Sequence, residues 1–372
     1  MLSYKILKIT REVKKLKPSF LKTSHLKSKI SNSIFETWFK YYKLNHKSKK
    51  NNKVLIISLE ALGDNIIKMT SFKKLSEIYG KENMYIMCRD EWSTIYKELG
   101  YNTLGVKKIK SPLKNAKYKI NLFKYINSLG IEKTILFEHI GIGSIQKYVL
   151  DGEKIGLCRD ENNVYLDKLV RIDDDKTYVL DRQIALMELL TNKEFTREEL
   201  RPDIREIFKN RKYKDIISIG IGASHEKKIL PEDTMVKILE LLLKRYANKR
   251  LILLGNGKKQ DNYAKNIMKK IQDNRVENYV GKTSLLETMQ VINDSNFFLG
   301  YDSGLSNIAF SLRKKYICLF WTELDIWQHP FDDLKIILGD RINPENDGYH
   351  GTEILNSIKL AQIEEALEEL KL

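Results

Sequence analysis

The chain has 372 residues, of which 42% are hydrophobic and 31% charged, and its formal net charge is +16. This length is enough for two domains of ordinary size, each with its own hydrophobic core. No run of about 18 apolar residues occurs, and the only cysteines are Cys88, Cys158 and Cys318. The sequence therefore predicts neither a membrane-spanning helix nor a disulfide framework, and it favours the reducing cytoplasm.

The positive charge is concentrated in residues 1–52, which we expect to form a basic amphipathic arm. Apolar residues recur there at helical spacing, and an aromatic group follows at Phe35, Trp38, Phe39, Tyr41 and Tyr42. A basic amphipathic helix with such a group suits the surface of an anionic membrane. A solvated, partly ordered arm is an equal alternative. Nucleic-acid binding is not expected, because no nucleic-acid-binding module accompanies the charge.

A first α/β series follows the arm. Lys53–Leu59 is a continuous apolar run typical of a central parallel strand, and a helical pattern covers Asn65–Tyr79. Further strands and helices are predicted at Met84–Met87, Glu91–Leu99, Lys117–Leu129, Thr134–Phe137 and Val179–Leu190. This alternation predicts a doubly wound, Rossmann-like domain at residues 53–205. Asn102–Lys117 and His139–Lys154 are expected to be loops, and the polar residues 151–176 are assigned no strand.

A second α/β series begins at Ile216–Ile221, and we assign residues 206–372 to a second Rossmann-like domain whose final helix can pack back on the first. Its further strands are predicted at Arg250–Leu254, Val276–Val280, Phe297–Leu299 and Tyr316–Phe320. In such sheets ligands bind outside the carboxyl ends of the strands. The turns found there are Gly63-Asp64, Gly222-Ala-Ser224, Gly255-Asn-Gly257 and Asp302–Asn307.

The stretch Gly300-Tyr-Asp-Ser-Gly-Leu-Ser-Asn307 lies on a predicted strand-to-helix turn. The first N–H groups of a helix are free to bind an anion, such as a diphosphate with a sugar attached. The alternative is an ordinary loop in which a Ser or Asp side chain only caps the helix.

Several familiar motifs are incomplete. Gly281-Lys-Thr283 lacks the glycine at 276 that a P-loop requires, and Gly255-Asn-Gly257 lacks a third glycine at 260. Asp173-Asp-Asp175 has an acid-x-acid spacing used by some metal sites, but it lies in a polar, surface-like segment. We therefore expect no metal site.

Four short segments, taken together, resemble the bacterial ADP-heptose:lipopolysaccharide heptosyltransferases, glycosyltransferase family 9. They begin at Ser58-Leu-Glu-Ala-Leu-Gly-Asp64, Gly222-Ala-Ser224, Gly281-Lys-Thr283 and Gly300-Tyr-Asp302, and Leu319-Phe-Trp-Thr322 resembles a further turn of the family. The resemblance spans roughly residues 53–330. It implies the GT-B fold, with two Rossmann-like domains facing a cleft, and inverting glycosyl transfer that needs neither a metal nor a cofactor.

The resemblance also implies roles for single residues. Asp64 matches the general base, with a helix N-cap as the alternative. Lys228 matches the cation that stabilises the leaving diphosphate, with a solvated lysine as the alternative. The expected donor-binding residues are Ser224, Gly255, Gln260, Asp261, Thr283, Asp302, Ser303, Gly304, Leu305, Ser306 and Asn307, and Gly63 and Asn65 are expected on the acceptor side.

The implied donor is a nucleotide sugar, ADP-heptose, and the implied acceptor is a saccharide or glycolipid of the cell envelope. The enzyme would then be cytoplasmic and peripheral on the inner face of the membrane, held there through residues 1–50. Asn307 stands where the family usually has His, and Gln260 or Asp261 would have to replace its ribose-binding acid. Another nucleotide sugar, used in polysaccharide or glycan synthesis, therefore remains an alternative. A third hypothesis is a non-catalytic binding protein that the arm recruits to a membrane or to nucleic acid.

Overall fold

The computed structural model describes residues 24–47, 49–107, 116–137, 145–158, 165–173, 176–224, 228–321, 325–339 and 355–372. By its internal contacts the chain divides into two compact units. The first takes in the chain as far as Leu59 and then Ser76–Arg171, and the second takes in Glu60–Leu75 and Ile172–Leu372. The short stretch that follows the first strand therefore folds with the second unit.

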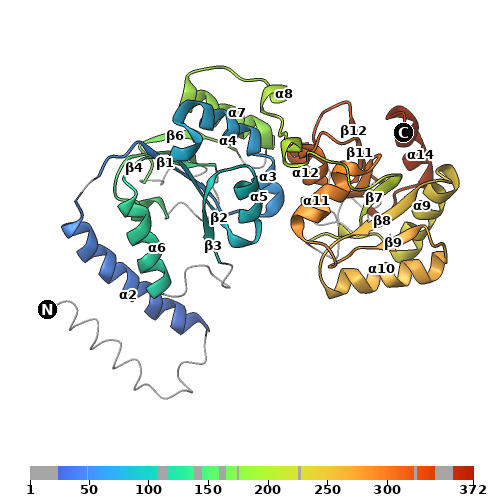
Figure 1. Cartoon of the computed structure of the whole chain (residues 1–372), viewed down its shortest axis with the longest axis horizontal. Coiled ribbons are helices and arrows are strands. Elements are labelled where there is room, and N and C mark those ends of the chain that lie inside the picture. Colours follow the sequence, from blue (N-terminus) through green and yellow to red (C-terminus); the bar gives the residue numbers. More distant parts are fainter. Residues whose placement is uncertain are drawn as a thin grey trace, which may run out of the picture. The chain divides into compact units, whose positions relative to one another are not determined.

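The first unit is built on a six-stranded parallel sheet in the order β3-β2-β1-β4-β5-β6 (Figure 1). Its strands are β1 (Lys53–Ser58), β2 (Met84–Arg89), β3 (Asn102–Val106), β4 (Ile131–Leu136), β5 (Glu153–Cys158) and β6 (Lys168–Arg171). Its helices include α2 (Ser24–Asn45), α5 (Ser93–Glu98) and α6 (Ala116–Ser128), with short 3-10 turns at Lys81–Asn83, Asp90–Trp92 and Gln146–Tyr148. This order is doubly wound, and the alternating pattern predicted a doubly wound sheet.

The sequence pattern did not predict three strands of this sheet. The prediction of a loop at Asn102–Lys117 is wrong for its first five residues, which form the edge strand β3, and residues 151–176 contain β5 and β6. β3 and β6 lie at the sheet edges, where two residues of β3 and none of β6 are buried, so neither needs an apolar run. Of the two expected loops, residues 108–115 and 139–144 lie outside the described residues.

Helix α2 is an integral part of the first unit and lies along α6 (Figure 1). Phe35, Trp38 and Phe39 are only 1%, 8% and 8% exposed, and they pack in the core with Phe123 and Tyr148. These three side chains are therefore not available to a membrane, contrary to the expectation, whereas Tyr41 of the same group is 49% exposed. Residues 1–23 of the arm lie outside the described residues. Within the part of the chain that the structure describes, no helix combines the length and apolar character needed to cross a bilayer.

The second unit repeats the same topology, with a parallel sheet in the order β12-β11-β10-β7-β8-β9. Its strands are β7 (Ile216–Gly220), β8 (Arg250–Leu254), β9 (Val276–Asn278), β10 (Phe298–Tyr301), β11 (Tyr316–Leu319) and β12 (Leu334–Ile337). The prediction of two doubly wound α/β domains is thus confirmed, although β12 was not among the predicted strands.

Helices cover both faces of this second sheet (Figure 1). Those after β7 are α9 (Glu232–Arg245), α10 (Lys258–Ile271), α11 (Leu285–Asp294), α12 (Gly304–Ser311) and α14 (Leu360–Glu369). α9, α10 and α14 share one apolar core with the sheet, and α14 contributes Ile363 and Leu367 to it. The final helix thus belongs to the core of the second unit.

The helix predicted at Asn65–Tyr79 is two helices, α3 (Leu62–Ile66) and α4 (Met69–Tyr79). The passage between the sheets contributes α7 (Val179–Thr191), α8 (Arg197–Leu200) and the 3-10 turn Arg205–Ile207, and a further 3-10 turn covers Asp325–Trp327. The N-cap of α3 is Ala61, and Asp64 is its third residue. The alternative that Asp64 is a helix N-cap is therefore wrong.

Candidate donor-binding site

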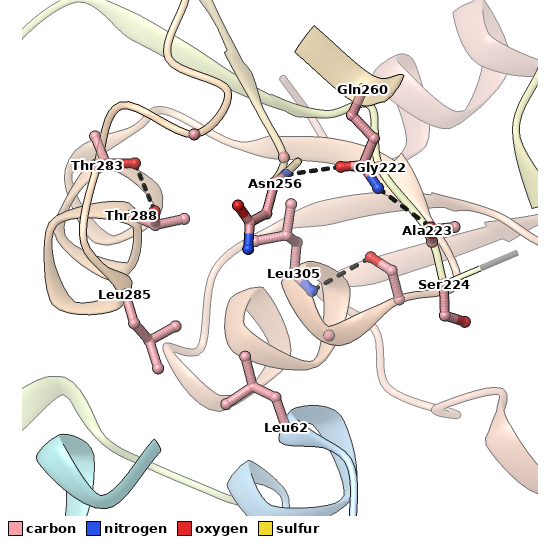
Figure 2. A pocket seen from close by; sticks show the side chains of 14 residues that line it. Leu62, Gly222, Ala223, Ser224, Asn256, Gln260, Thr283, Leu285, Thr288 and Leu305 are labelled. Carbon is pink, nitrogen blue, oxygen red and sulfur yellow. Dashed lines mark hydrogen bonds between the residues drawn. The ribbon is translucent and has the colours of Figure 1, made fainter. Parts of the chain in front are cut away.

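A pocket opens in the second unit where its strand order reverses, between β7 and β10. The loops leaving neighbouring strands diverge at such a point and leave a crevice outside their carboxyl ends. The cavity has a volume of about 370 Å³, and 14 residues line it (Figure 2). They are Leu62, Gly222, Ala223, Ser224, Gly255, Asn256, Gln260, Gly281, Thr283, Leu285, Thr288, Ser303, Gly304 and Leu305, all from the second unit.

Gln260 joins two of the loops that form this pocket. Its Oε1 accepts a hydrogen bond of 2.7 Å from the Asn256 N–H, and its Nε2 donates one of 3.2 Å to the Ala223 carbonyl (Figure 2). A Cβ at Gly222 would lie 1.9 Å from Oε1, and one at Gly255 would lie 2.5 Å from it. The two glycines therefore leave the space that this bridging amide fills.

The first turn of α12 forms another wall of the pocket. Ser303 is the N-cap of α12, and its Oγ accepts a 3.3 Å hydrogen bond from the Leu305 N–H. Ser306 is buried, and its Oγ accepts from the Ser303 N–H at 3.1 Å, so it serves the cap and does not line the pocket. Ser303 therefore caps the helix. Because Ser303, Gly304 and Leu305 also line the cavity, the positive end of the helix dipole lies at the cavity wall.

The opposite wall carries hydroxyl and apolar groups. Thr283 and Thr288 share a 2.8 Å hydrogen bond, and Leu285 begins α11 beside them (Figure 2). The exposed side chain of Asn256 adds an amide. No charged side chain occurs among the described residues that line the pocket. This wall therefore offers hydrogen bonds and apolar contact, which suit an uncharged nucleoside better than a second anion.

Asp261, one of the two residues expected to hold a ribose, does not line the pocket. Its carboxylate accepts hydrogen bonds from Lys265 at 2.6 Å and from Asn278 at 2.8 Å. The hydrogen bonds from Lys265 and Asn278 lower the pKa of Asp261. Of the two candidates, the structure brings only Gln260 to the cavity.

Asp302, at the carboxyl end of β10, is held from two sides. Lys228 Nζ lies 2.7 Å from Asp302 Oδ2 and 4.4 Å from the centre of the Trp321 ring. The Trp321 indole N–H donates a 2.7 Å hydrogen bond to the same oxygen. Lys228 is therefore a fixed, largely buried cation rather than a solvated lysine. Sequence reasoning assigned no role to Trp321, although it follows β11 at the same edge of the sheet.

Helix α3 packs against the beginning of α12, so Gly63 and Asn307 are in close contact. A Cβ at Gly63 would lie 2.3 Å from Asn307 Nδ2, and one at Gly304 would lie 3.8 Å from the Gly63 nitrogen. Asp64, half-buried, is the third residue of α3. The expected base therefore lies on a helix that touches Asp302–Asn307, the donor loop.

Asn65 is 1% exposed, and its amide nitrogen donates to the carbonyls of Glu60 at 3.1 Å and Ala61 at 2.9 Å. These bonds hold the turn that begins α3. The structure does not bring the Asn65 side chain to a surface that an acceptor could reach.

Asp174 and Asp175 of the acid-x-acid segment lie outside the described residues. Among the residues that the structure does describe, no group of three His, Cys, Asp or Glu side chains could hold a metal ion.

Two doubly wound parallel sheets, with a pocket at the switch point of the second, form a GT-B-like fold. The sequence model of glycosyltransferase family 9 (heptosyltransferase) matches residues 144–353, and the chain belongs to this family. The resemblance noted in the four short segments is thereby confirmed.

Known relatives agree with this assignment. The chain is 23% identical over 291 residues to lipopolysaccharide heptosyltransferase 1 of Campylobacter coli. The aligned region is 72% of this chain and 83% of that protein. A family 9 glycosyltransferase structure from Veillonella parvula covers 88% of this chain and 99% of its own, with a TM-score of 0.72 and 15% identity. The E. coli heptosyltransferase WaaC with ADP-2-deoxy-2-fluoro heptose covers 84% and 99%, with a TM-score of 0.66 and 14% identity. Because these identities are low, the structural matches show a shared fold and no more.

Proposed function

We propose that this protein transfers a heptose or a similar sugar from a nucleoside-diphosphate donor, ADP-heptose in the first instance, to a saccharide acceptor of the cell envelope. The observation that carries this proposal is the pocket at the switch point of the second sheet, walled by the amino end of α12 and adjoining the helix of Asp64. Its volume of about 370 Å³ is in the range of ordinary ligand pockets.

The donor is proposed to span the pocket from wall to wall. The base and ribose contact Asn256, Gln260, Thr283 and Thr288, where hydroxyl and amide groups predominate. The diphosphate lies at the start of α12, where N–H groups and the helix dipole favour an anion. Asp302, held by Lys228 and Trp321, binds hydroxyl groups of the sugar.

The chemistry is an inverting displacement that needs no metal. Asp64 takes the proton from the acceptor hydroxyl, and the oxygen attacks the anomeric carbon on the face opposite the diphosphate. The new carbon–oxygen bond forms as the bond to the diphosphate oxygen breaks. Lys228 and the α12 N–H groups stabilise the negative charge that develops on the leaving group.

The assignment of the base is tested with Asp64→Asn, which keeps the size of the side chain but removes its basicity. We expect the transfer rate to fall about 10²- to 10⁴-fold, the range for a lost general base, with nucleotide affinity unchanged. Asp261→Asn is the matched control, because Asp261 lies outside the pocket. Transfer by Asp64→Asn at close to the wild-type rate would reject Asp64 as the base.

The donor is tested by thermal-shift titration with ADP-, UDP- and GDP-sugars. We expect the largest stabilisation with ADP-heptose. A preference for a uridine or guanosine donor would favour the alternative, a transferase of the same fold that serves another polysaccharide or glycan. Binding without turnover of any donor would favour a non-catalytic role.

We also propose that helix α2 contacts the inner, anionic surface of the cell membrane, where a glycolipid acceptor would be found. Lys40 and Lys43 are exposed on α2, as is Lys47 just after its end, and Tyr41 and Leu44 beside them are 49% and 84% exposed. Lysines near an anionic surface each contribute about 1 kcal/mol, and the two apolar side chains can enter the interface.

Flotation with vesicles of phosphatidylglycerol and phosphatidylcholine tests this contact. Changing Lys40, Lys43 and Lys47 to Glu should abolish flotation at low salt, whereas the same change at Lys237, Lys244 and Lys269, exposed in the second unit, should not. Equal flotation of both variants would exclude α2 as the contact.

A further inference from the structure

His329 is a buried imidazole that the proposed chemistry does not use. It follows the 3-10 turn Asp325–Trp327, is 4% exposed, and stacks on Phe310 with ring centres 3.8 Å apart and planes 6° from parallel. Phe310 lies on α12, three residues after Asn307. The imidazole is therefore fixed directly behind the helix that carries the donor loop.

Both ring nitrogens of His329 are hydrogen-bonded. Nδ1 lies 2.7 Å from the hydroxyl of Tyr178, and Nε2 lies 3.2 Å from Oδ1 of Asn307. Oδ1 can only accept, so Nε2 carries the proton and Nδ1 accepts from the Tyr178 hydroxyl. The reverse direction would leave the Tyr178 O–H, which is almost completely buried, without an acceptor among the described residues. The chain of bonds therefore runs from Tyr178 through His329 to Asn307.

This direction decides which way the Asn307 amide faces. With Oδ1 bonded to His329, Nδ2 points to Gly63 on α3, where a Cβ would come within 2.3 Å of it. Within the part of the chain that the structure describes, Nδ2 has no hydrogen-bond partner, and it is not among the fully buried polar atoms. The Asn307 amide therefore holds Nδ2 beside α3, where its N–H group can still donate a hydrogen bond.

We propose that His329 is a positioning residue of the transfer site. Through its Nε2–H bond to Oδ1, it orients the Asn307 amide so that Nδ2 donates a hydrogen bond to an oxygen of the donor's diphosphate-sugar end. This inference rests on the proposed function, because it assigns the buried imidazole to the same donor site. Asn307 makes the contact, and His329 and Tyr178 prevent its amide from flipping.

The environment of His329 keeps this arrangement constant at ordinary pH. Burial, aided by the nearby Arg201 guanidinium, lowers the pKa of His329 to about 3. Arg201 stacks over Phe310 and Phe331 and pairs with Asp333 at 2.5 Å. Burial likewise raises the pKa of Tyr178, so its hydroxyl keeps its proton. A neutral imidazole with one fixed tautomer therefore faces Asn307.

The test compares His329→Gln with His329→Phe. Gln can direct an amide N–H to Asn307 Oδ1 from about the position of Nε2, but it loses the stacking on Phe310. Phe keeps the stacking and loses both hydrogen bonds. We expect kcat/KM for the donor to fall about tenfold or more in His329→Phe, the loss expected for one charge-assisted hydrogen bond, and about threefold or less in His329→Gln. Thermal stability should follow the opposite order.

Tyr178→Phe should cause a smaller loss, because the imidazole then becomes free to change its tautomer and let the Asn307 amide flip. His46→Phe serves as the control for the loss of an imidazole, since His46 pairs with Asp151 in the first unit. Higher activity in His329→Gln together with higher stability in His329→Phe supports the proposal.

Three results would overturn it. Folded His329→Phe with wild-type kcat/KM shows that Asn307 needs no orientation. Activity that follows stability, with Phe above Gln in both, shows a purely structural role. Failure of the wild type to bind ADP, UDP or GDP in calorimetry defeats the proposed function itself, and the positioning role with it. The wild-type titration therefore separates the two kinds of failure.

Discussion

The two units share one strand order, yet they use the carboxyl ends of their strands differently. In the described part of the first unit, side chains lie at the carboxyl end of β2: Arg89 donates a 2.6 Å hydrogen bond to the Leu59 carbonyl and stacks on Trp92, and Asp90 packs against Gly105. In the second unit the corresponding loops carry Gly222, Gly255, Gly281 and Gly304 around an open cavity. At the strand ends that the structure describes, the strand order is the same, so the residues that follow each strand determine how much space is left there.

The largest effect is expected from Lys228, which pairs with Asp302, the residue before the pocket-lining Ser303. Lys228→Met should lower the transfer rate about 100-fold or more, because it removes positive charge from the leaving group and leaves the Asp302 carboxylate to repel the diphosphate. Steady-state kinetics measures this loss. Lys270→Met, which breaks an exposed pair with Glu232 and Asp233, is the control and should keep full activity. Equal rates in the two variants would remove Lys228 from the mechanism.

Gly304→Ala tests whether a ligand binds at the carboxyl ends of the strands in the second unit. Its Cβ would have 3.6 Å to the nearest protein atom, on Leu62, which is ordinary contact, so the folded protein accommodates it. A diphosphate at the α12 N–H groups must approach this backbone closely, and we expect its affinity to fall about tenfold, as for one lost charge-assisted hydrogen bond. Calorimetry with ADP measures this. Unchanged affinity would mean that the diphosphate binds elsewhere.

Gly156→Ala makes the reciprocal test in the first unit. A Cβ there would lie 2.8 Å from Cβ and 2.9 Å from the carbonyl oxygen of Leu136, both fixed by the pairing of β4 and β5. We expect overpacking to lower the free energy of unfolding by roughly 1–3 kcal/mol, with nucleotide affinity unchanged. Urea denaturation and calorimetry together check this. A loss of affinity in Gly156→Ala would show that the pocket depends on the packing of the first sheet.

The same contrast explains what could be predicted from sequence. Glycines and hydroxyls that follow apolar runs are local signals, so the loops at Ser224, Gly255 and Ser303 were found, and the two-domain fold with them. Trp321 and His329 carry no such signal. Their roles depend on partners such as Asp302 and Tyr178, which are distant in the sequence and meet only through the tertiary fold. The edge strands β3 and β6 were missed because a strand buried on few sides needs little apolar sequence.

The smallest effect concerns how the second unit tolerates acid. Burial holds the pKa of His329 at about 3, against about 6.5 for an unfolded histidine, so between these values the unfolded chain binds more protons. Stability should therefore fall as pH decreases below about 6.5, by about 1 kcal/mol between pH 6 and pH 5. Urea unfolding, monitored by a probe in the second unit, measures this slope. His329→Phe should flatten it by that amount, whereas His46→Phe in the first unit should leave it in place. An unchanged slope in His329→Phe would mean that other groups govern the acid sensitivity of the second unit.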